Sequence, residues 1–164
     1  MNYWLCTLIT GAGATALMDL WGVARKPLLG IPAPDYGLVG RWLAWMPRGR
    51  FRHESIAASP AMHGERVLGW SAHYLIGIAF AAILLGIGGH SWILQPTLAP
   101  ALLVGTATLA APFLLMQPGM GAGLAARRTA RPAAARLQSL LSHMVFGLGL
   151  YAAGLAARLV CGQW

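Results

Sequence analysis

Four long apolar runs, separated by more polar segments, dominate the pattern along the chain. They cover roughly residues 3–24, 67–88, 97–116 and 137–160. Each is close to the length, about 20 residues, that a helix needs to cross the hydrocarbon core of a bilayer. The pattern therefore predicts an all-α membrane protein, one integral membrane domain over residues 1–164, with four transmembrane helices arranged as two hairpins. Residues 25–66 and 117–136 are then connecting loops.

Charged residues and prolines mark the expected ends of the spans. The sequence Arg25-Lys26-Pro27 is expected to stop the first span. Residues 89–96 form the expected turn between the second and third spans. Pro112 is expected to bend the third span, and Pro118 to end it.

The first loop contains a further helical pattern. Asp35 is a typical helix cap. The apolar and aromatic residues that follow it predict a short interfacial helix, which runs to about Met46 and is ended by Pro47.

The composition supports the membrane assignment, and the charges orient the chain. The chain is 57% hydrophobic and 10% charged, whereas soluble domains carry about 25% charged residues. All of the 12 Lys and Arg residues except Arg158 lie in the first and third loops. By the positive-inside rule both loops are cytoplasmic, so both termini are expected in the periplasm.

The net charge of +8 would suggest nucleic acid in a soluble protein. Here it points to anionic lipid headgroups instead, because the charges flank the apolar runs. No zinc knuckle, RNP motif or basic zipper is present, so no nucleic-acid partner is expected.

Three titratable residues, Asp19, His73 and His143, lie inside the predicted spans. At about 1.5 Å rise per residue, each is roughly 9–10 Å from the basic boundary of its span, so we expect one polar layer. Each shares a helix face with small residues, which should point into the bundle. Four interpretations stay open: structural pairing between helices, a site for a small solute or protons, two axial histidines on haem, or a His/His/Asp metal site.

An internal repeat is one reading of the same spans. The pattern Arg-x6-His-x3-Gly begins at Arg66 and again at Arg136. It suggests two hairpins of equal orientation, related by an axis along the membrane normal. Glycine-rich spans also produce such short matches by chance.

The first loop carries the densest basic segment. Its arginines are expected to serve topology and to contact lipid headgroups, with binding of a phosphate or carboxylate as the alternative. The glycines of residues 117–123 are interpreted as a flexible span exit, with an anion-binding nest as the alternative. The predicted cytoplasmic mouth of the polar layer consists of Arg41, Arg48, Arg50, Arg52, His53, Glu54 and Gln117.

Cys6 and Cys161 lie near the outward ends of the first and last spans. They pair if those helices adjoin; two buried free thiols are the interpretation we favour. The aromatic residues near the span ends predict a belt at the membrane interface, made of Tyr3, Trp4, Trp21, Trp70, Trp92 and Trp164.

Five segments carry a resemblance: Met18-Asp-Leu-Trp21, Gly40-Arg-Trp42, Pro47-Arg-Gly-Arg-Phe-Arg-His-Glu54, Gln117-Pro-Gly-Met-Gly121 and Phe146-Gly-Leu-Gly-Leu-Tyr151. Together they resemble a family of small bacterial multi-pass membrane proteins with only a domain-of-unknown-function label. The resemblance covers nearly the whole chain and implies a bacterial inner-membrane protein. It supplies no substrate, cofactor or catalytic residue.

The first function hypothesis is a small-solute or proton-coupled carrier or channel component. The alternatives are a haem- or metal-binding membrane subunit and a non-catalytic assembly or lipid-binding factor. An enzyme is not indicated, because HExxH, GxSxG and paired carboxylates are absent. Four short helices make a thin bundle, so a homodimer or a larger membrane complex is expected.

Overall fold

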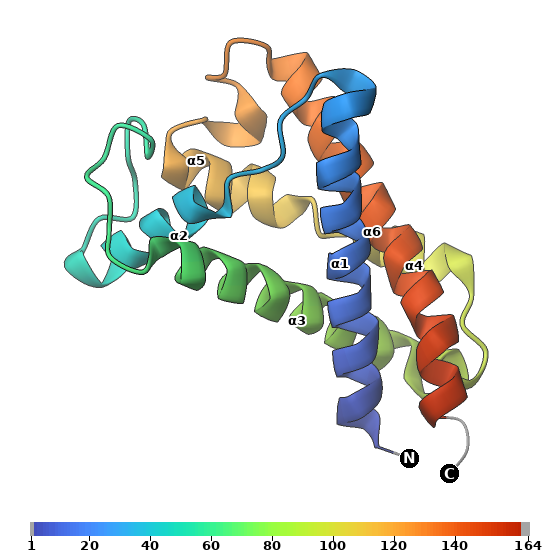
Figure 1. Cartoon of the computed structure of the whole chain (residues 1–164). Helices are drawn as coiled ribbons and strands as arrows, with labels where there is room; N and C mark the ends of the chain where they lie inside the picture. The colour runs from blue at the N-terminus through green and yellow to red at the C-terminus, as the bar shows by residue number, and fades with distance from the viewer. Residues whose placement is uncertain (1, 162–164) are drawn as a thin grey trace. The chain divides into compact units, whose positions relative to one another are not determined.

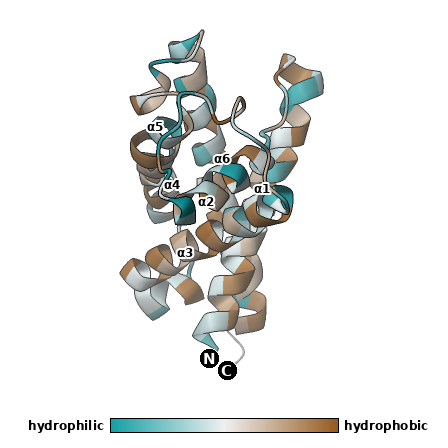
Figure 2. Ribbon diagram, turned by 90° about the vertical axis from the view of Figure 1, so that its left-hand side faces the viewer, coloured by the Kyte–Doolittle hydropathy of each residue, from teal (hydrophilic) through white to brown (hydrophobic). Residues whose placement is uncertain are grey.

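The computed structural model describes residues 2–161, which form helices and loops without a β-strand. Four helical stretches are long and apolar enough to cross a membrane. They are α1 (Tyr3–Leu29), α3 (Glu65–Leu94), the broken helix Leu98–Met120, and α6 (Pro132–Cys161) (Figure 1). Long stretches of these helices are white or brown in the hydropathy colouring of Figure 2. The predicted all-α class with four candidate spans is confirmed.

The helix surfaces carry many large apolar side chains. Leu20, Ile87 and Leu103 are 65%, 75% and 71% exposed. Soluble monomers rarely display such extensive apolar surface, whereas lipid tails solvate it readily. These exposed leucines and isoleucines are those expected of lipid-facing helices.

The sequence predicted that the first span stops at Pro27. This prediction is wrong. The helix α1 includes this proline and continues to Leu29. Gly30 then adopts a left-handed conformation (φ 69°), and its N–H donates to the Lys26 carbonyl at 2.9 Å. Pro27 removes one hydrogen bond from the helix, but the helix ends only where Gly30 adopts the positive φ that glycine tolerates.

The short helix predicted in the first loop is present as α2 (Tyr36–Trp45), and its interfacial location stays a prediction. The Asp35 side chain caps it by accepting the Gly37 N–H at 2.9 Å. One 3₁₀ turn, Met46–Arg48, contains Pro47 and follows directly. The cap and the position of the helix agree with the sequence.

Residues 89–96 are not the open turn that we expected. Helical backbone resumes after a single non-helical residue, Gly89 (φ 61°, ψ −161°), and runs to Leu94. Trp92 on this extension is 4% exposed, and its indole N–H donates to the Thr97 carbonyl at 3.2 Å. The assignment of Trp92 to an interfacial belt is therefore wrong, while Trp164 of that belt lies outside the described residues.

The third span is interrupted, as Pro112 predicted. It consists of α4 (Leu98–Ala107), a π-helical segment Pro112–Met116, and α5 (Gln117–Met120). A proline lacks the N–H that a regular helix needs, so the backbone rearranges around it. The expected stop at Pro118 is wrong: helix α5 continues to Met120 and ends at Gly121, with φ 99°. A 3₁₀ turn, Leu124–Ala126, follows.

The chain divides into two compact units. Unit 1 comprises residues 1–33, 74–108 and 141–164, and unit 2 comprises residues 34–73 and 109–140. The core of unit 1 is apolar and includes Leu84, Leu85 and Leu150, which are fully buried.

Glycines set the helix contacts inside unit 1. A Cβ at Gly11 would lie 3.0 Å from the Ile78 backbone nitrogen, and one at Gly77 would clash with Thr15, so α1 and α3 touch backbone to backbone. Likewise, a Cβ at Gly105 of α4 would lie 2.7 Å from the Gly147 backbone nitrogen of α6. Small residues permit such close approach between membrane helices.

Within unit 1 both contacts are antiparallel. Residues later in α1 meet residues earlier in α3, and α4 and α6 follow the same rule. Whether these two helix pairs are copies of one repeat stays a prediction.

Cys6 and Cys161 form a disulfide, so the interpretation as free thiols is wrong. Their Cα atoms are 6.2 Å apart, within the range that a disulfide spans. The reason is the packing of α1 on α6: Gly13 lies against Ala153, and Gly149 against Ala14. This antiparallel contact brings the first turn of α1 to the last turn of α6.

Candidate functional site

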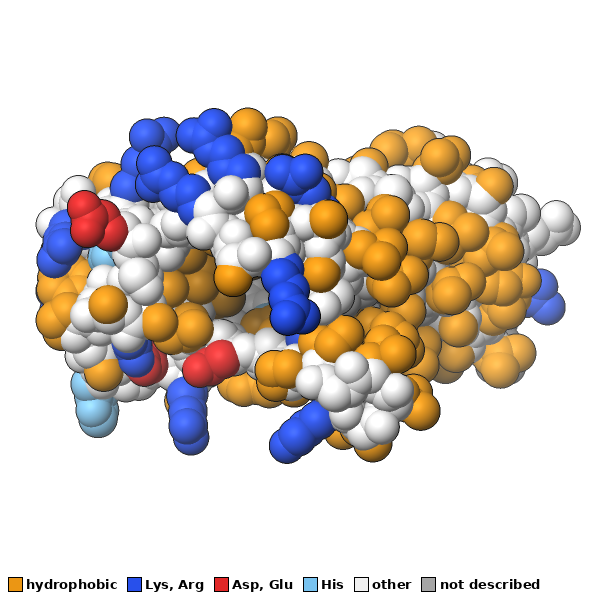
Figure 3. All heavy atoms as spheres, turned by 90° about the horizontal axis from the view of Figure 1, so that it is seen from above, with side chains coloured by type: hydrophobic (Ala, Val, Ile, Leu, Met, Phe, Trp, Pro, Cys, Tyr) orange, Lys and Arg blue, Asp and Glu red, His pale blue; other side chains and the backbone are white. Residues whose placement is uncertain are grey.

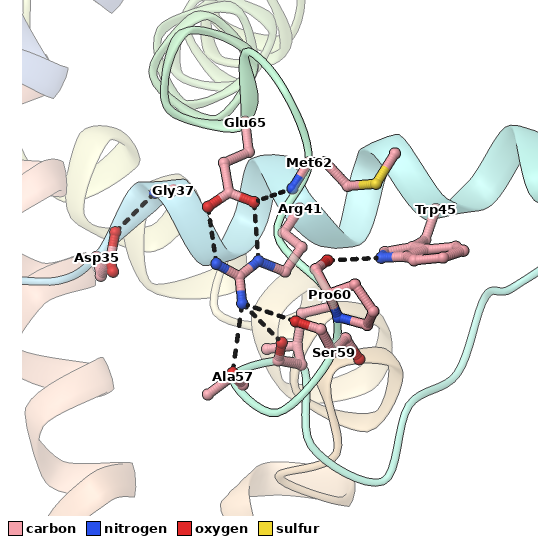
Figure 4. Close-up of polar contacts among 10 residues, drawn as sticks. Asp35, Gly37, Arg41, Trp45, Ala57, Ser59, Pro60, Met62 and Glu65 are labelled. Carbon is pink, nitrogen blue, oxygen red and sulfur yellow. Dashed lines mark hydrogen bonds and ion pairs between the residues drawn. The ribbon is translucent and has the colours of Figure 1, made fainter.

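The most extensive polar network described lies in unit 2 and centres on Arg41 of α2 (Figure 4). The Arg41 guanidinium binds both carboxylate oxygens of Glu65 at 2.8 Å, one through Nε and one through Nη2. Its Nη1 donates to three loop carbonyls, those of Ile56, Ala57 and Ser59, at 3.4, 3.3 and 3.0 Å. Arg41 thus fastens the first loop to the start of α3.

Two glycines make this network sterically feasible. A Cβ at Gly40 would lie 2.6 Å from the Gly69 backbone nitrogen, and one at Gly69 would lie 3.0 Å from the Gly40 nitrogen. The α2 and α3 backbones therefore touch one residue away from Arg41. The Glu65 carboxylate also accepts the Met62 N–H at 2.8 Å, which fixes the chain as it enters α3.

The surroundings of Arg41 favour its charged form. The hydrogen bonds to Glu65 raise the pKa of the Arg41 guanidinium, and the negative charges of Glu65 and Asp35 add to this, while desolvation opposes it. Arg41 is consequently a permanent cation whose donors are engaged inside the chain. An external anion has to displace these bonds to reach it.

Two segments that the sequence singled out separately pack together in unit 2. The His53 N–H donates to the Gly119 carbonyl at 2.9 Å, and the Ile56 N–H donates to the Met120 carbonyl at 3.0 Å. Gly121 lies so close to the Glu54 carbonyl that a Cβ there would clash. The glycine segment is therefore a packed contact surface for the first loop, and not the flexible exit that we expected.

The His53 side chain is enclosed in this contact, with 7% exposure. Its Nδ1 lies 2.9 Å from Ser59 Oγ, and that hydroxyl donates to the Ser55 carbonyl at 3.2 Å. Because a hydroxyl has one proton, Nδ1–H is the donor to Ser59. His53 Nε2 and Gln117 Oε1 are both buried and lack a hydrogen-bond partner among the described residues.

The remaining residues of the predicted mouth are exposed. Arg48, Arg50, Arg52 and Glu54 all lie at the surface. Blue basic side chains outnumber red acidic ones on the face drawn in Figure 3. Unit 2 thus places His53 inside the loop contact and these charged side chains around its outside.

The predicted intramembrane residues are found in both units. In unit 1 the Asp19 carboxylate is hydrogen-bonded to the Tyr74 side chain. His143 Nδ1 lies 2.9 Å from Thr108 Oγ1, whose hydroxyl donates to the Gly105 carbonyl at 2.6 Å, so the imidazole is the donor to Thr108. Asp19 and His143 each have a polar partner inside unit 1.

His73 belongs to unit 2, where its ring stacks on Tyr36 at a centroid distance of 3.9 Å. A common depth for all three titratable residues stays a prediction. The described residues contain no group of three or more His, Cys, Asp or Glu side chains placed to hold a metal ion.

The sequence did not reveal the side chains that pair with Asp19, His143 and Arg41. Tyr74 directly follows His73, and neighbours on a helix face different directions, so its pairing with Asp19 gave no periodic signal. Thr108 looked like an ordinary small polar residue. Glu65 had one usable signal, because it is one of only 4 acidic residues and stands where an apolar run begins.

The family model DUF2938, described as a protein of unknown function, matches residues 8–157. The chain belongs to this family. The match confirms the resemblance to an uncharacterised family, and it includes all of α2 and both segments of the unit 2 contact. No curated protein and no solved structure matches the chain significantly. Membership in DUF2938 therefore supplies no activity, and the function has to be argued from the residues themselves.

Proposed function

We propose that this DUF2938 protein is a small-solute or proton-coupled carrier or channel component of the bacterial inner membrane. Asp19, His73 and His143 are its proposed polar intramembrane residues. The observation that carries the proposal is the pair of polar contacts in unit 1, Asp19 with Tyr74 and His143 with Thr108. Both lie on helices that are otherwise apolar enough to cross a membrane.

The energetic argument concerns the placement of these groups. A charged side chain at the centre of a span costs about 2.5–3.5 kcal/mol on insertion scales. A purely structural hydrogen bond between membrane helices contributes only about 0.6 kcal/mol on average. Since the cost exceeds that gain, a titratable group such as Asp19 is better explained by a functional role than by stability.

The chemistry of Asp19, His73 and His143 fits proton-coupled transport. Imidazoles take up and release protons near neutral pH, and a carboxylate beside a phenol offers an acceptor next to a donor. Their helices meet at glycines, as Gly11 and Gly105 show, and this close approach brings polar side chains beside the contacts within reach of the neighbouring helix.

Two independent features support a periplasmic position for both termini. The disulfide between Cys6 and Cys161 joins the start of α1 to the end of α6, and structural disulfides persist in the periplasm but not in the cytoplasm. The basic loops lie at the opposite ends of these helices, where the positive-inside rule expects the cytoplasm. Both point to the same orientation.

The proposed cytoplasmic mouth consists of the first loop and the glycine segment. The hydrogen bonds of His53 and Ile56 to Gly119 and Met120 support a role for the two segments as one unit. In this proposal Arg41 organises the mouth from inside, while Arg48, Arg50 and Arg52 face incoming solutes or lipid. His53 and Gln117 line the contact between the segments, and the exposed Glu54 side chain lies outside it.

The test is proton flux in liposomes that contain the purified protein and an internal pH-sensitive dye, with an imposed pH gradient. We expect flux above that of empty liposomes, and its loss in His73→Ala and in His143→Ala. His90→Ala is the matched control, because His90 is exposed and outside the proposed layer. Equal flux in all three variants, with each inserted and monodisperse, removes the proposal.

A further inference from the structure

The end of α2 is followed by a tightly fixed turn that points its side chains outward. Gly49 is left-handed (φ 76°), and its N–H donates to the Met46 carbonyl at 2.9 Å. The Arg50 N–H reaches the Trp45 carbonyl at 3.3 Å, and the Trp42 indole N–H donates to the Phe51 carbonyl at 2.9 Å. We call Arg48, Arg50, Phe51 and Arg52 the arginine tip. Its backbone is held from both sides.

The positive charges of the arginine tip are ordered but not neutralised. The guanidinium groups of Arg48 and Arg50 lie 5.7 and 5.0 Å from the centre of the Trp45 ring. Arg48 also donates to the Ala44 carbonyl at 2.8 Å. In the described part of the chain none of the three arginines forms an ion pair.

An exposed aromatic ring stands among these charges. Phe51 is 60% exposed and lies between Arg50 and Arg52 in sequence. Exposure of so large an apolar group to water is unfavourable, whereas the boundary between headgroups and acyl chains accommodates both the ring and its cationic neighbours. The tip thus combines guanidinium groups, which can bind phosphate, with the apolar ring of Phe51.

From this combination we propose that the arginine tip is a binding site for the phosphate headgroup of an anionic phospholipid. The tip lies in the connection between α1 and α3, two helices long enough to cross the membrane, so it stays within reach of the bilayer surface. Guanidinium groups bind phosphate oxygens through paired N–H donors, and Phe51 enters the acyl region beside the bound headgroup. The same arginines belong to the proposed mouth, but lipid binding at the tip does not require that the protein transports anything.

The ordering of the tip distinguishes a specific site from general attraction. Orientation of a membrane protein needs only positive charge in a loop. It does not need two guanidinium groups held over a tryptophan ring, or a backbone fixed by an indole. Lysine would satisfy topology equally, but it lacks the planar fork and stacks less well on an aromatic ring.

The experiment uses the full-length protein, delipidated in mild detergent and mixed with equal amounts of phosphatidylglycerol and phosphatidylcholine. Bound lipid is counted by native mass spectrometry. Both lipids carry a phosphate, but choline balances its charge in phosphatidylcholine, so we expect the parent protein to prefer phosphatidylglycerol by about tenfold. The double variant Arg50→Lys, Arg52→Lys keeps the charge but lacks the paired donors, so it should bind phosphatidylglycerol about tenfold less tightly than the parent protein.

Two further variants make the outcome decisive. The double variant Arg127→Lys, Arg128→Lys changes the other basic loop in the same way and should bind phosphatidylglycerol as tightly as the parent protein. Phe51→Ser should weaken binding of both lipids without changing net charge. If the Arg50 and Arg52 variant binds like the parent protein, or if the Arg127 and Arg128 variant loses as much, the site is refuted in favour of diffuse attraction.

Discussion

Replacement of Gly69 by alanine tests whether the α2–α3 contact holds unit 2 together. A Cβ at Gly69 would clash with the Tyr36 carbonyl and lie 3.0 Å from the Gly40 nitrogen. Both obstacles are backbone atoms, so neither can rotate away. The α2 helix would have to move away from α3.

The size of the effect follows from these contacts. Overpacking of this kind costs typically 1–3 kcal/mol, while alanine gains about 0.5–1 kcal/mol over glycine within a helix. The net expectation is a loss of about 1–2 kcal/mol of unfolding free energy. The same displacement strains the 2.8 Å bonds between Arg41 and Glu65, so the first loop should loosen as well.

The assay is thermal unfolding in detergent, followed by tryptophan fluorescence, with Gly86→Ala as the matched control. Gly86 is on the same helix, and a Cβ there would meet nothing within 4 Å. We expect Tm to fall by roughly 2–8 °C in Gly69→Ala and to stay level or rise in the control. If Gly69→Ala unfolds at the same temperature as the parent protein, the close contact between α2 and α3 is refuted.

Two other predictions concern the disulfide and the loop contact. Reduction should change the gel mobility of the parent protein but not that of Cys6→Ser. In Cys6→Ser, a membrane-impermeant thiol reagent should label Cys161 from the periplasmic side. Labelling only from the cytoplasm would contradict the orientation. His53→Ala removes the hydrogen bond to Ser59 and should speed tryptic cleavage in the first loop of the folded protein. His63→Ala, at an exposed position, should not change the cleavage rate. Equal rates in the two variants would show that His53 does not hold the loop.

Local features of the chain were readable from its residues. The four apolar runs, the helix capped by Asp35 and the interruption at Pro112 all follow from hydrophobicity over a short window or from the chemistry of one residue. The predicted helix ends were wrong where a proline was followed within a few residues by a glycine. Proline at position 27 and at position 118 was taken as a stop, but glycines a few residues later end both helices.

Only the tertiary structure decided which distant residues meet. Arg41 and Glu65 are 24 residues apart, and Cys6 and Cys161 are separated by 155. No periodicity links such positions, because the contacts depend on how closely two helix backbones approach. Glycines control that approach, and a glycine in the sequence does not say which helix it will face. The residue types of the candidate sites were therefore visible in the sequence, whereas the pairing of Asp19 with Tyr74 and the backbone bond between His53 and Gly119 required the fold.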